Sequence, residues 1–124
     1  MLSHIHSINV PVKDQAKAVE FYTTKLGFKV ICDSEIPEMN QRWIELQVGD
    51  SNTAISLFTS QGQENLVGKF NNISFATNDI DKTVAELKAK GVSFCQEVAE
   101  VFWGRMALFL DLDGNVFCIG ESNE

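Results

Sequence analysis

The chain carries one sequence pattern twice, and this repeat constrains the fold more than any other feature. The first copy begins at Ser7 (SINVPVKDQAKAVEFYTTKLGFKV) and the second at Asn72 (NISFATNDIDKTVAELKAKGVSF). Equivalent residues such as Asp14 and Asp79 lie 65 positions apart. A repeat of this kind indicates two copies of one supersecondary unit that share a core.

Each copy predicts a strand, a helix and a second strand. The opening residues alternate apolar with polar, which is typical of a strand with one buried face. Asp14 or Asp79 follows at the position of a helix N-cap. The helix carries an apolar stripe and ends at Gly27 or Gly91, because glycine readily adopts the left-handed conformation of a helix stop.

Two further strands follow in each half. The segments QRWIELQV and TAISLFT flank the turn GDSN, and GRMALFL and NVFCIGE flank the turn DLDG. Each module is therefore β-α-β-β-β, with module 1 at about 1–60, a linker at 61–70 and module 2 at about 71–124. We predict a single α+β domain over 1–124, in which two tandem modules form a curved mixed sheet around a cavity with the helices outside.

Composition narrows the classes of partner. The net charge of -7 and the pI of about 4.7 argue against nucleic acid and against an anionic membrane surface. We expect no membrane span, because no apolar run approaches the roughly 20 residues that one needs. We expect a cytoplasmic protein, because MLSHIHSINV does not read as a signal peptide and three cysteines without a C-x-x-C pattern do not suggest a disulfide framework.

The two modules resemble a known family. The segments VPVKDQAKAVEFYTTKLGF, RWIEL, DIDKTVAELKAKGV, WGRMALFLD and DGNVF are similar to the vicinal oxygen chelate superfamily. That superfamily contains glyoxalase I, extradiol dioxygenases, fosfomycin resistance enzymes and bleomycin-binding proteins. The resemblance covers nearly the whole chain and implies the fold more strongly than the function, because the fold hosts many chemistries. It also implies a homodimer, since pockets of this family often lie at a dimer interface.

The resemblance further implies where a metal would be bound. Metalloenzymes of the family carry one ligand on the first strand of each module, seven residues before the capping aspartate, and another, usually glutamate, on the last strand. The matching positions here are Ser7, Ser56, Asn72 and Cys118. Since none is a histidine or a carboxylate, we expect no metal site and no cofactor.

His6 is the tempting substitute ligand. Strand alternation places His6 on the same face as Ile8 and Val10, toward the helix, and His4 shares that parity. We therefore interpret His6 as a structural or surface residue. A bulge at the N-terminus would reverse this expectation.

Trp43, Glu45 and Gln47 alternate with the more apolar Ile44 and Leu46. The apolar set should face the helix, which leaves the other three in the cavity as a wall of stacking area and hydrogen-bonding groups. A half-exposed sheet face or a dimer surface is the alternative. Glu45 is a weak catalytic candidate, because a desolvated carboxylate can act as a base.

The second module offers further candidates. Trp103 and Arg105 could clamp a planar or anionic ligand, or Trp103 could close the core while Arg105 pairs with a surface acid. Cys118 is a weak candidate for a nucleophile, and otherwise a small residue that lines the cavity.

These observations favour metal-free binding of a small organic molecule in the cavity. The predicted ligand-binding residues are Ser7, Asn9, Trp43, Glu45, Gln47, Ser56, Asn72, Ser74, Trp103, Arg105 and Cys118. The first alternative is a lyase, isomerase or dioxygenase-type enzyme that uses Glu45 as a base or binds a metal through unconventional ligands such as His6 and Glu45. The second is a non-catalytic domain that acts through partner proteins.

Overall fold

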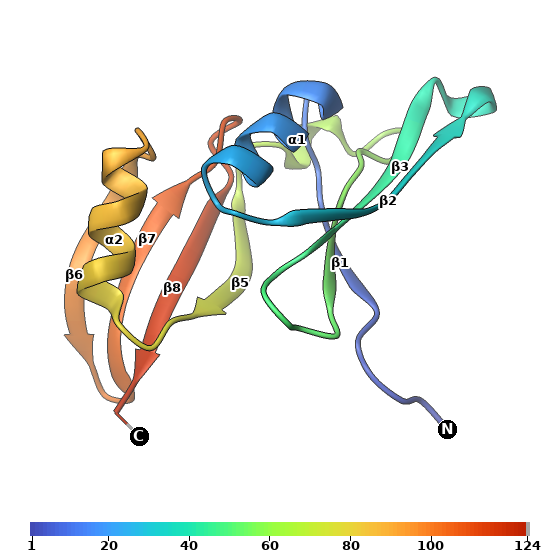
Figure 1. Ribbon diagram of the computed structural model, residues 1–124. Helices are drawn as coiled ribbons and strands as arrows, with labels where there is room; N and C mark the ends of the chain where they lie inside the picture. The colour runs from blue at the N-terminus through green and yellow to red at the C-terminus, as the bar shows by residue number, and fades with distance from the viewer. Residues whose placement is uncertain (124) are drawn as a thin grey trace. The chain divides into compact units, whose positions relative to one another are not determined.

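The computed structural model describes residues 1–123 and divides into two compact units, Met1–Val67 and the segment from Gly68 onward. Each unit has one open, curved four-stranded sheet and one α-helix of ten residues (Figure 1). The predicted α+β fold with two tandem β-α-β-β-β modules is therefore confirmed. The cavity expected between the modules remains a prediction. Within the described residues no helix is long and apolar enough to cross a membrane.

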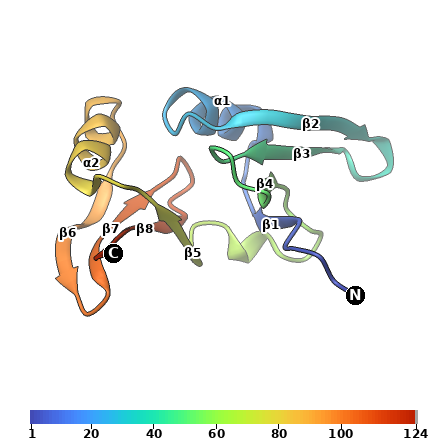
Figure 2. The same cartoon turned by 60° about the horizontal axis from the view of Figure 1, so that its bottom comes forward.

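Unit 1 is built on a mixed sheet. Its elements are β1 (Ser7–Val10), α1 (Gln15–Thr24), β2 (Lys29–Ile36), the 3-10 helix η1 (Pro37–Met39), β3 (Gln41–Gln47), β4 (Ala54–Leu57) and the 3-10 helix η2 (Glu64–Leu66). The strand order is β1-β4-β3-β2, with β1 parallel to β4 and the other pairs antiparallel. Strands β2 and β3 form a long hairpin with η1 at its tip (Figure 2).

Unit 2 repeats this plan. Its elements are β5 (Phe70–Ala76), α2 (Ile80–Ala89), β6 (Phe94–Val101), β7 (Gly104–Leu110) and β8 (Val116–Ser122). The strand order β5-β8-β7-β6 matches the order of unit 1, with β5 in the place of β1 and β8 in the place of β4. Register agrees as well, since Asn9 lies opposite Ser56 in unit 1 and Ser74 lies opposite Cys118 in unit 2.

Both helices begin and end where the repeat predicts. The carboxylate of Asp14 accepts a hydrogen bond from the N–H of Lys17 at 3.0 Å, and Asp79 accepts one from Lys82 at 3.1 Å. These bonds satisfy backbone donors that have no partner within the helix. Gly27 and Gly91 follow the helices with φ of 75° and 87°, a conformation that glycine adopts without steric cost.

The core of each unit lies between its helix and one face of its sheet. In unit 1 the side chains of Val10, Ile44, Leu46 and Leu57 are fully buried, as is Tyr22 of α1. Burial of each such side chain contributes roughly 1.5–3 kcal/mol. In unit 2 the ring of Phe109 lies 5.5 Å from that of Phe117 and 6.1 Å from that of Phe75. The faces turned away from the helices are therefore free for other roles.

Candidate functional site

The sheet of unit 1 has a polar face on the side opposite to the buried core. Pairing across the strands aligns Asn9 with Ser56 and Ser56 with Glu45, and it aligns Ser7 with Ala54 and Ala54 with Gln47. Directly paired residues share one face of a sheet, and alternate residues along β3 add Trp43 to the same face. The polar face of unit 1 is defined here by six residues, Ser7, Asn9, Trp43, Glu45, Gln47 and Ser56.

Glu45 is the centre of this face. Its side chain is buried, with 9% of the residue exposed, although it is charged in its ordinary state. The indole N–H of Trp43 donates to Oε2 of Glu45 at 2.8 Å, and Nε2 of His6 lies 3.2 Å from the same oxygen. Hydrogen bonds to an ionised group are stronger than neutral ones, so both contacts orient the carboxylate. A buried, oriented acceptor of this kind is what a specific binding site needs.

The contact between His6 and Glu45 overturns one expectation. Alternation placed His6 toward the helix with Ile8 and Val10, and that placement is wrong. The His6 carbonyl accepts from the N–H of Ala54 at 2.9 Å, but β1 begins only at Ser7, so the alternation of the strand cannot be extended to His6. His6 reaches Glu45 from a largely exposed position, with 72% of its side chain accessible.

Asn9 and Ser56 are locked to each other. The Ser56 hydroxyl donates to Oδ1 of Asn9 at 2.9 Å, and the Asn9 amide donates to the carbonyl of Phe58 at 2.8 Å. Ser56 is 1% exposed. These two side chains therefore hold each other in a fixed position next to Glu45 on the polar face of unit 1.

An aromatic pair lies on the same face. The rings of Trp43 and Phe58 lie 5.4 Å apart at 54°, a tilted arrangement that such pairs prefer. Phe58 did not appear among the residues predicted from sequence. The signal was present, because Phe58 lies two positions beyond Ser56 and so continues its alternation. The structure thus adds Phe58 and His6 to the expected set.

Unit 2 has a corresponding face with a different character. Ser74 and Cys118 are directly paired across β5 and β8. The ring of Trp103 lies over Gly120, since a Cβ at that glycine would be 2.9 Å from Cη2 of the indole and 3.4 Å from Oγ of Ser74. Trp103, Ser74 and Cys118 therefore share this face.

Arg105 does not join them, so the predicted clamp of Trp103 and Arg105 is wrong. Nη2 of Arg105 donates to Asp81 of α2 at 2.9 Å and contacts Glu121 at 3.3 Å. The hydrogen bond and charge of Asp81, followed by those of Glu121, raise the pKa of Arg105 above its ordinary value. The same Glu121 accepts from the N–H of Ile80 at 2.7 Å. Arg105 therefore takes part in a charged network that joins α2 to its sheet. This is the alternative stated in the sequence analysis, in which Arg105 pairs with acidic side chains.

The four positions that correspond to metal ligands do not fit a divalent ion. Ser7 is neutral and the hydroxyl of Ser56 already donates to Asn9. Asn72 sits in the left-handed region at φ 51°, within a register shift of β5. The thiol of Cys118 donates to the carbonyl of Ile119 at 3.5 Å. Over residues 1–123 no group of three histidine, cysteine or acidic side chains is placed to hold a metal.

The family is decided by a match to a family model. Residues 4–119 match the model of the Glyoxalase/Bleomycin resistance protein/Dioxygenase superfamily. The chain belongs to this superfamily. The resemblance found in the sequence is therefore confirmed, and the serine, asparagine and cysteine at the ligand positions mark it as a member without the usual metal ligands.

Relatives cover the chain along its full length. The uncharacterized protein YetH of Bacillus subtilis (strain 168) is 33% identical over 125 residues, which span 98% of this chain and 100% of YetH. A probable chloroplastic lactoylglutathione lyase of Arabidopsis thaliana is 32% identical over 86% of this chain, but that match spans 32% of the plant protein. The crystal structure of TnmS3, an antibiotic binding protein from Streptomyces sp. CB03234, has a TM-score of 0.88 at 29% identity and covers 98% of each chain.

Proposed function

We propose that this protein binds a small organic molecule on the polar face of unit 1, with no metal ion among its binding groups. The observation that carries the proposal is the buried carboxylate of Glu45, which is held by Trp43 and His6, with the ring of Phe58 packed against that of Trp43. Burying a carboxylate is costly unless it is well bonded, and a structural role would be served as well by an apolar side chain.

The chemistry of the face specifies a class of ligand. Trp43 and Phe58 offer aromatic surface for an apolar, flat body. Glu45 accepts hydrogen bonds, so the ligand should carry a hydroxyl, amine or amide N–H at the edge that faces it. The hydrogen bond between Asn9 and Ser56 fixes both side chains before the ligand binds, which lowers the entropic cost of binding.

Two further observations support the proposal. TnmS3, which the chain resembles over 98% of its length, is an antibiotic binding protein. The positions at which metalloenzyme relatives carry ligands hold Ser7, Ser56, Asn72 and Cys118, whose donors suit hydrogen bonding better than coordination of a divalent cation. Binding without a metal is the simplest use of such a site.

Tryptophan fluorescence tests where a ligand is bound. The chain has two tryptophans, so Trp103→Phe leaves Trp43 as the reporter and Trp43→Phe leaves Trp103. A titration with flat heteroaromatic phenols and amines should quench Trp43 saturably in the first variant. Binding that equilibrium dialysis detects but that leaves Trp43 unchanged would exclude the polar face of unit 1 as the site.

An enzyme is the second candidate, because His6 and Glu45 form a contact of the kind that moves protons. The carboxylate could take a proton from a substrate and His6 could accept or return it. The likeness to a probable lactoylglutathione lyase supports this candidate. Proton exchange on an activated C–H substrate, followed by NMR in deuterium oxide, tests it. Exchange in the parent protein that Glu45→Gln abolishes would favour catalysis. Equal exchange in the parent and in the Glu45→Gln variant would exclude Glu45 as the catalytic base.

We also propose that the protein is a cytoplasmic homodimer formed by a single domain. The dimer follows from the resemblance to the family, and the location follows from the composition of the chain. Light scattering over a range of concentrations tests the dimer, since a constant monomer mass contradicts it. Cell fractionation tests the location.

A further inference from the structure

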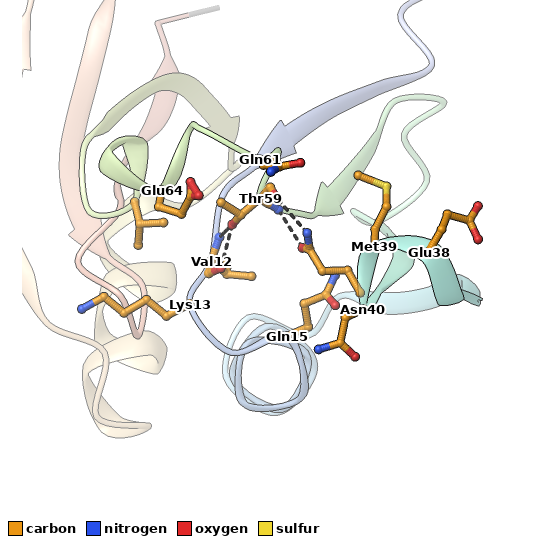
Figure 3. A pocket seen from close by; sticks show the side chains of 11 residues that line it. Val12, Lys13, Gln15, Glu38, Met39, Asn40, Thr59, Gln61 and Glu64 are labelled. Carbon is orange, nitrogen blue, oxygen red and sulfur yellow. Dashed lines mark hydrogen bonds between the residues drawn. The ribbon is translucent and has the colours of Figure 1, made fainter.

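Unit 1 contains a pocket that none of the predicted site residues lines. Its volume is about 760 Å³, within the range of small-molecule sites. The pocket lies between the tip of the β2–β3 hairpin, the start of α1 and the segment that follows β4 (Figure 3). No residue of the polar face of unit 1 belongs to its lining. It is therefore a second place at which this unit could hold a molecule.

The inner wall of the pocket is fixed by side chains bonded to backbone. The Gln15 amide donates to the carbonyls of Arg42 at 2.6 Å and Leu57 at 2.7 Å, while its oxygen accepts from the N–H of Arg42 at 2.9 Å. Three parts of unit 1 are thereby joined by one side chain. The pocket keeps its shape without a ligand, which reduces the entropic cost of filling it.

Thr59 ties together the floor in the same way. Gln41 donates to the Thr59 carbonyl at 2.8 Å and accepts from its N–H at 3.2 Å. The Thr59 hydroxyl donates to the carbonyl of Val12 at 2.7 Å and lies 2.9 Å from the Val12 N–H, which donates to it. Dashed lines in Figure 3 mark these contacts. The backbone at the floor is thus satisfied, and specificity must come from the rim.

The rim combines negative charge with neutral hydrogen-bonding groups. Glu38 and Asn40 stand at the hairpin tip, and Gln61 and Glu64 stand on the segment after β4. All four residues are exposed, and the carboxylate of Glu64 also accepts from the N–H of Gly62 at 3.0 Å. Lys13 also lines the pocket, but the two carboxylates outnumber it. In a chain of net charge -7 this rim attracts cations rather than anions.

We propose that the pocket binds a hydroxylated organic amine about as large as an amino-disaccharide. Ammonium groups would pair with Glu38 and Glu64, and hydroxyl groups would bond to the amides of Asn40 and Gln61. The body of the ligand would rest on Val12 and Met39. This site is independent of the ligand proposed for the polar face of unit 1, because the two share no side chain.

A matched pair of sugars tests the proposal. The β-1,4-linked disaccharide of glucosamine and its hydroxyl analogue cellobiose differ in charge and little in shape. In a ¹⁵N–¹H titration the amino sugar should shift the backbone signals of Val12, Asn40 and Thr59 and saturate. Cellobiose should bind at least about fivefold more weakly, since two exposed ion pairs contribute that much, and added salt should reduce the difference.

Variants assign the charge effect to the rim. Glu38→Gln and Glu64→Gln should each weaken the amino sugar by about threefold and leave cellobiose unchanged. Glu20→Gln makes the same change of charge on the exposed surface of α1, outside the pocket, and should alter neither affinity. Equal affinity for both sugars, shifts confined to residues outside the pocket, or an equal effect of Glu20→Gln would each overturn the proposal.

Discussion

Trp43 and Glu45, two residues apart on β3, are bonded through their side chains, with the indole N–H donating to Oε2 across 2.8 Å. Alternation along a strand brings both side chains to one face, and the bond fixes their relative orientation there. This contact joins the aromatic surface and the carboxylate, so the ligand proposed for this face would meet both together.

The first prediction concerns this bond. Trp43→Phe keeps an aromatic ring but removes the donor, which leaves the buried carboxylate of Glu45 with one fewer hydrogen bond. Unfolding in urea should show a loss of about 1–3 kcal/mol, the cost of an unsatisfied buried group together with the smaller ring.

The matched control is Trp103→Phe in unit 2. Trp103 is 37% exposed, so the same exchange removes less buried area there. We expect a loss of stability less than half as large. Equal losses for the two variants would mean that the bond between Trp43 and Glu45 contributes nothing of its own.

A second prediction concerns backbone packing at Gly104. A Cβ there would lie 2.0 Å from the carbonyl oxygen of Glu121, and φ is 154°. Since backbone cannot yield as a side chain can, Gly104→Ala should cost more than about 3 kcal/mol or prevent folding.

Gly49→Ala separates clash from conformational strain. Gly49 also has a positive φ, 54°, but nothing lies within 4 Å of its added Cβ. Its replacement should cost only about 1 kcal/mol, the strain of the left-handed region. Melting curves of both variants decide the point, and a Gly104→Ala protein as stable as Gly49→Ala would contradict the packing.

A third prediction is a dependence of stability on pH. Nε of Arg42 donates to Oδ1 of Asp33 at 2.8 Å, and this hydrogen bond, with the charge of Arg42, holds the pKa of Asp33 below its ordinary value of 3.8. A lowered pKa stabilises the folded state above the unfolded value, and the gain is lost as pH falls through the folded value.

Asp33→Asn should therefore be less stable than the parent at neutral pH, and the gap should shrink as the pH falls below 3.8 and through the lowered pKa of Asp33. Urea midpoints at the two pH values measure it. Asp50→Asn, in an exposed turn, serves as the control for removal of a carboxylate. A gap that stays constant with pH would show that the pair does not contribute through the charge of Asp33.

The fold could be predicted from the sequence because the repeat carries its own register. Asp14 and Asp79 cap the two helices as expected. The structure then pairs Asn9 with Ser56 and Ser74 with Cys118, which are equivalent positions of the two repeats. Strand alternation then separates Trp43 and Glu45 from Ile44 and Leu46, since a period of two leaves no other choice.

The site was predictable only inside the regular strands. His6 lies before β1, outside the strand whose alternation was used to place it, and its side chain bonds to Glu45. Arg105 lies just after Gly104, whose unusual backbone ends the alternation that would link it to Trp103. The pocket at the tip of the β2–β3 hairpin was not predicted from the sequence. Gln15 and Gln41 are ordinary polar residues in the sequence, and their role appears only when the segments that they join are known.

The central claim is that the polar face of unit 1 binds a small molecule without a metal. The most direct measurement is the melting temperature of chelator-treated protein against a panel of flat aromatic compounds with hydrogen-bond donors. The account predicts that at least one compound raises the melting temperature, with a stabilisation of the folded state of about 2.7 kcal/mol at a free ligand concentration a hundred times Kd, and that Glu45→Gln removes this rise. A panel without any rise, or a rise that appears only when divalent ions are restored, would contradict it.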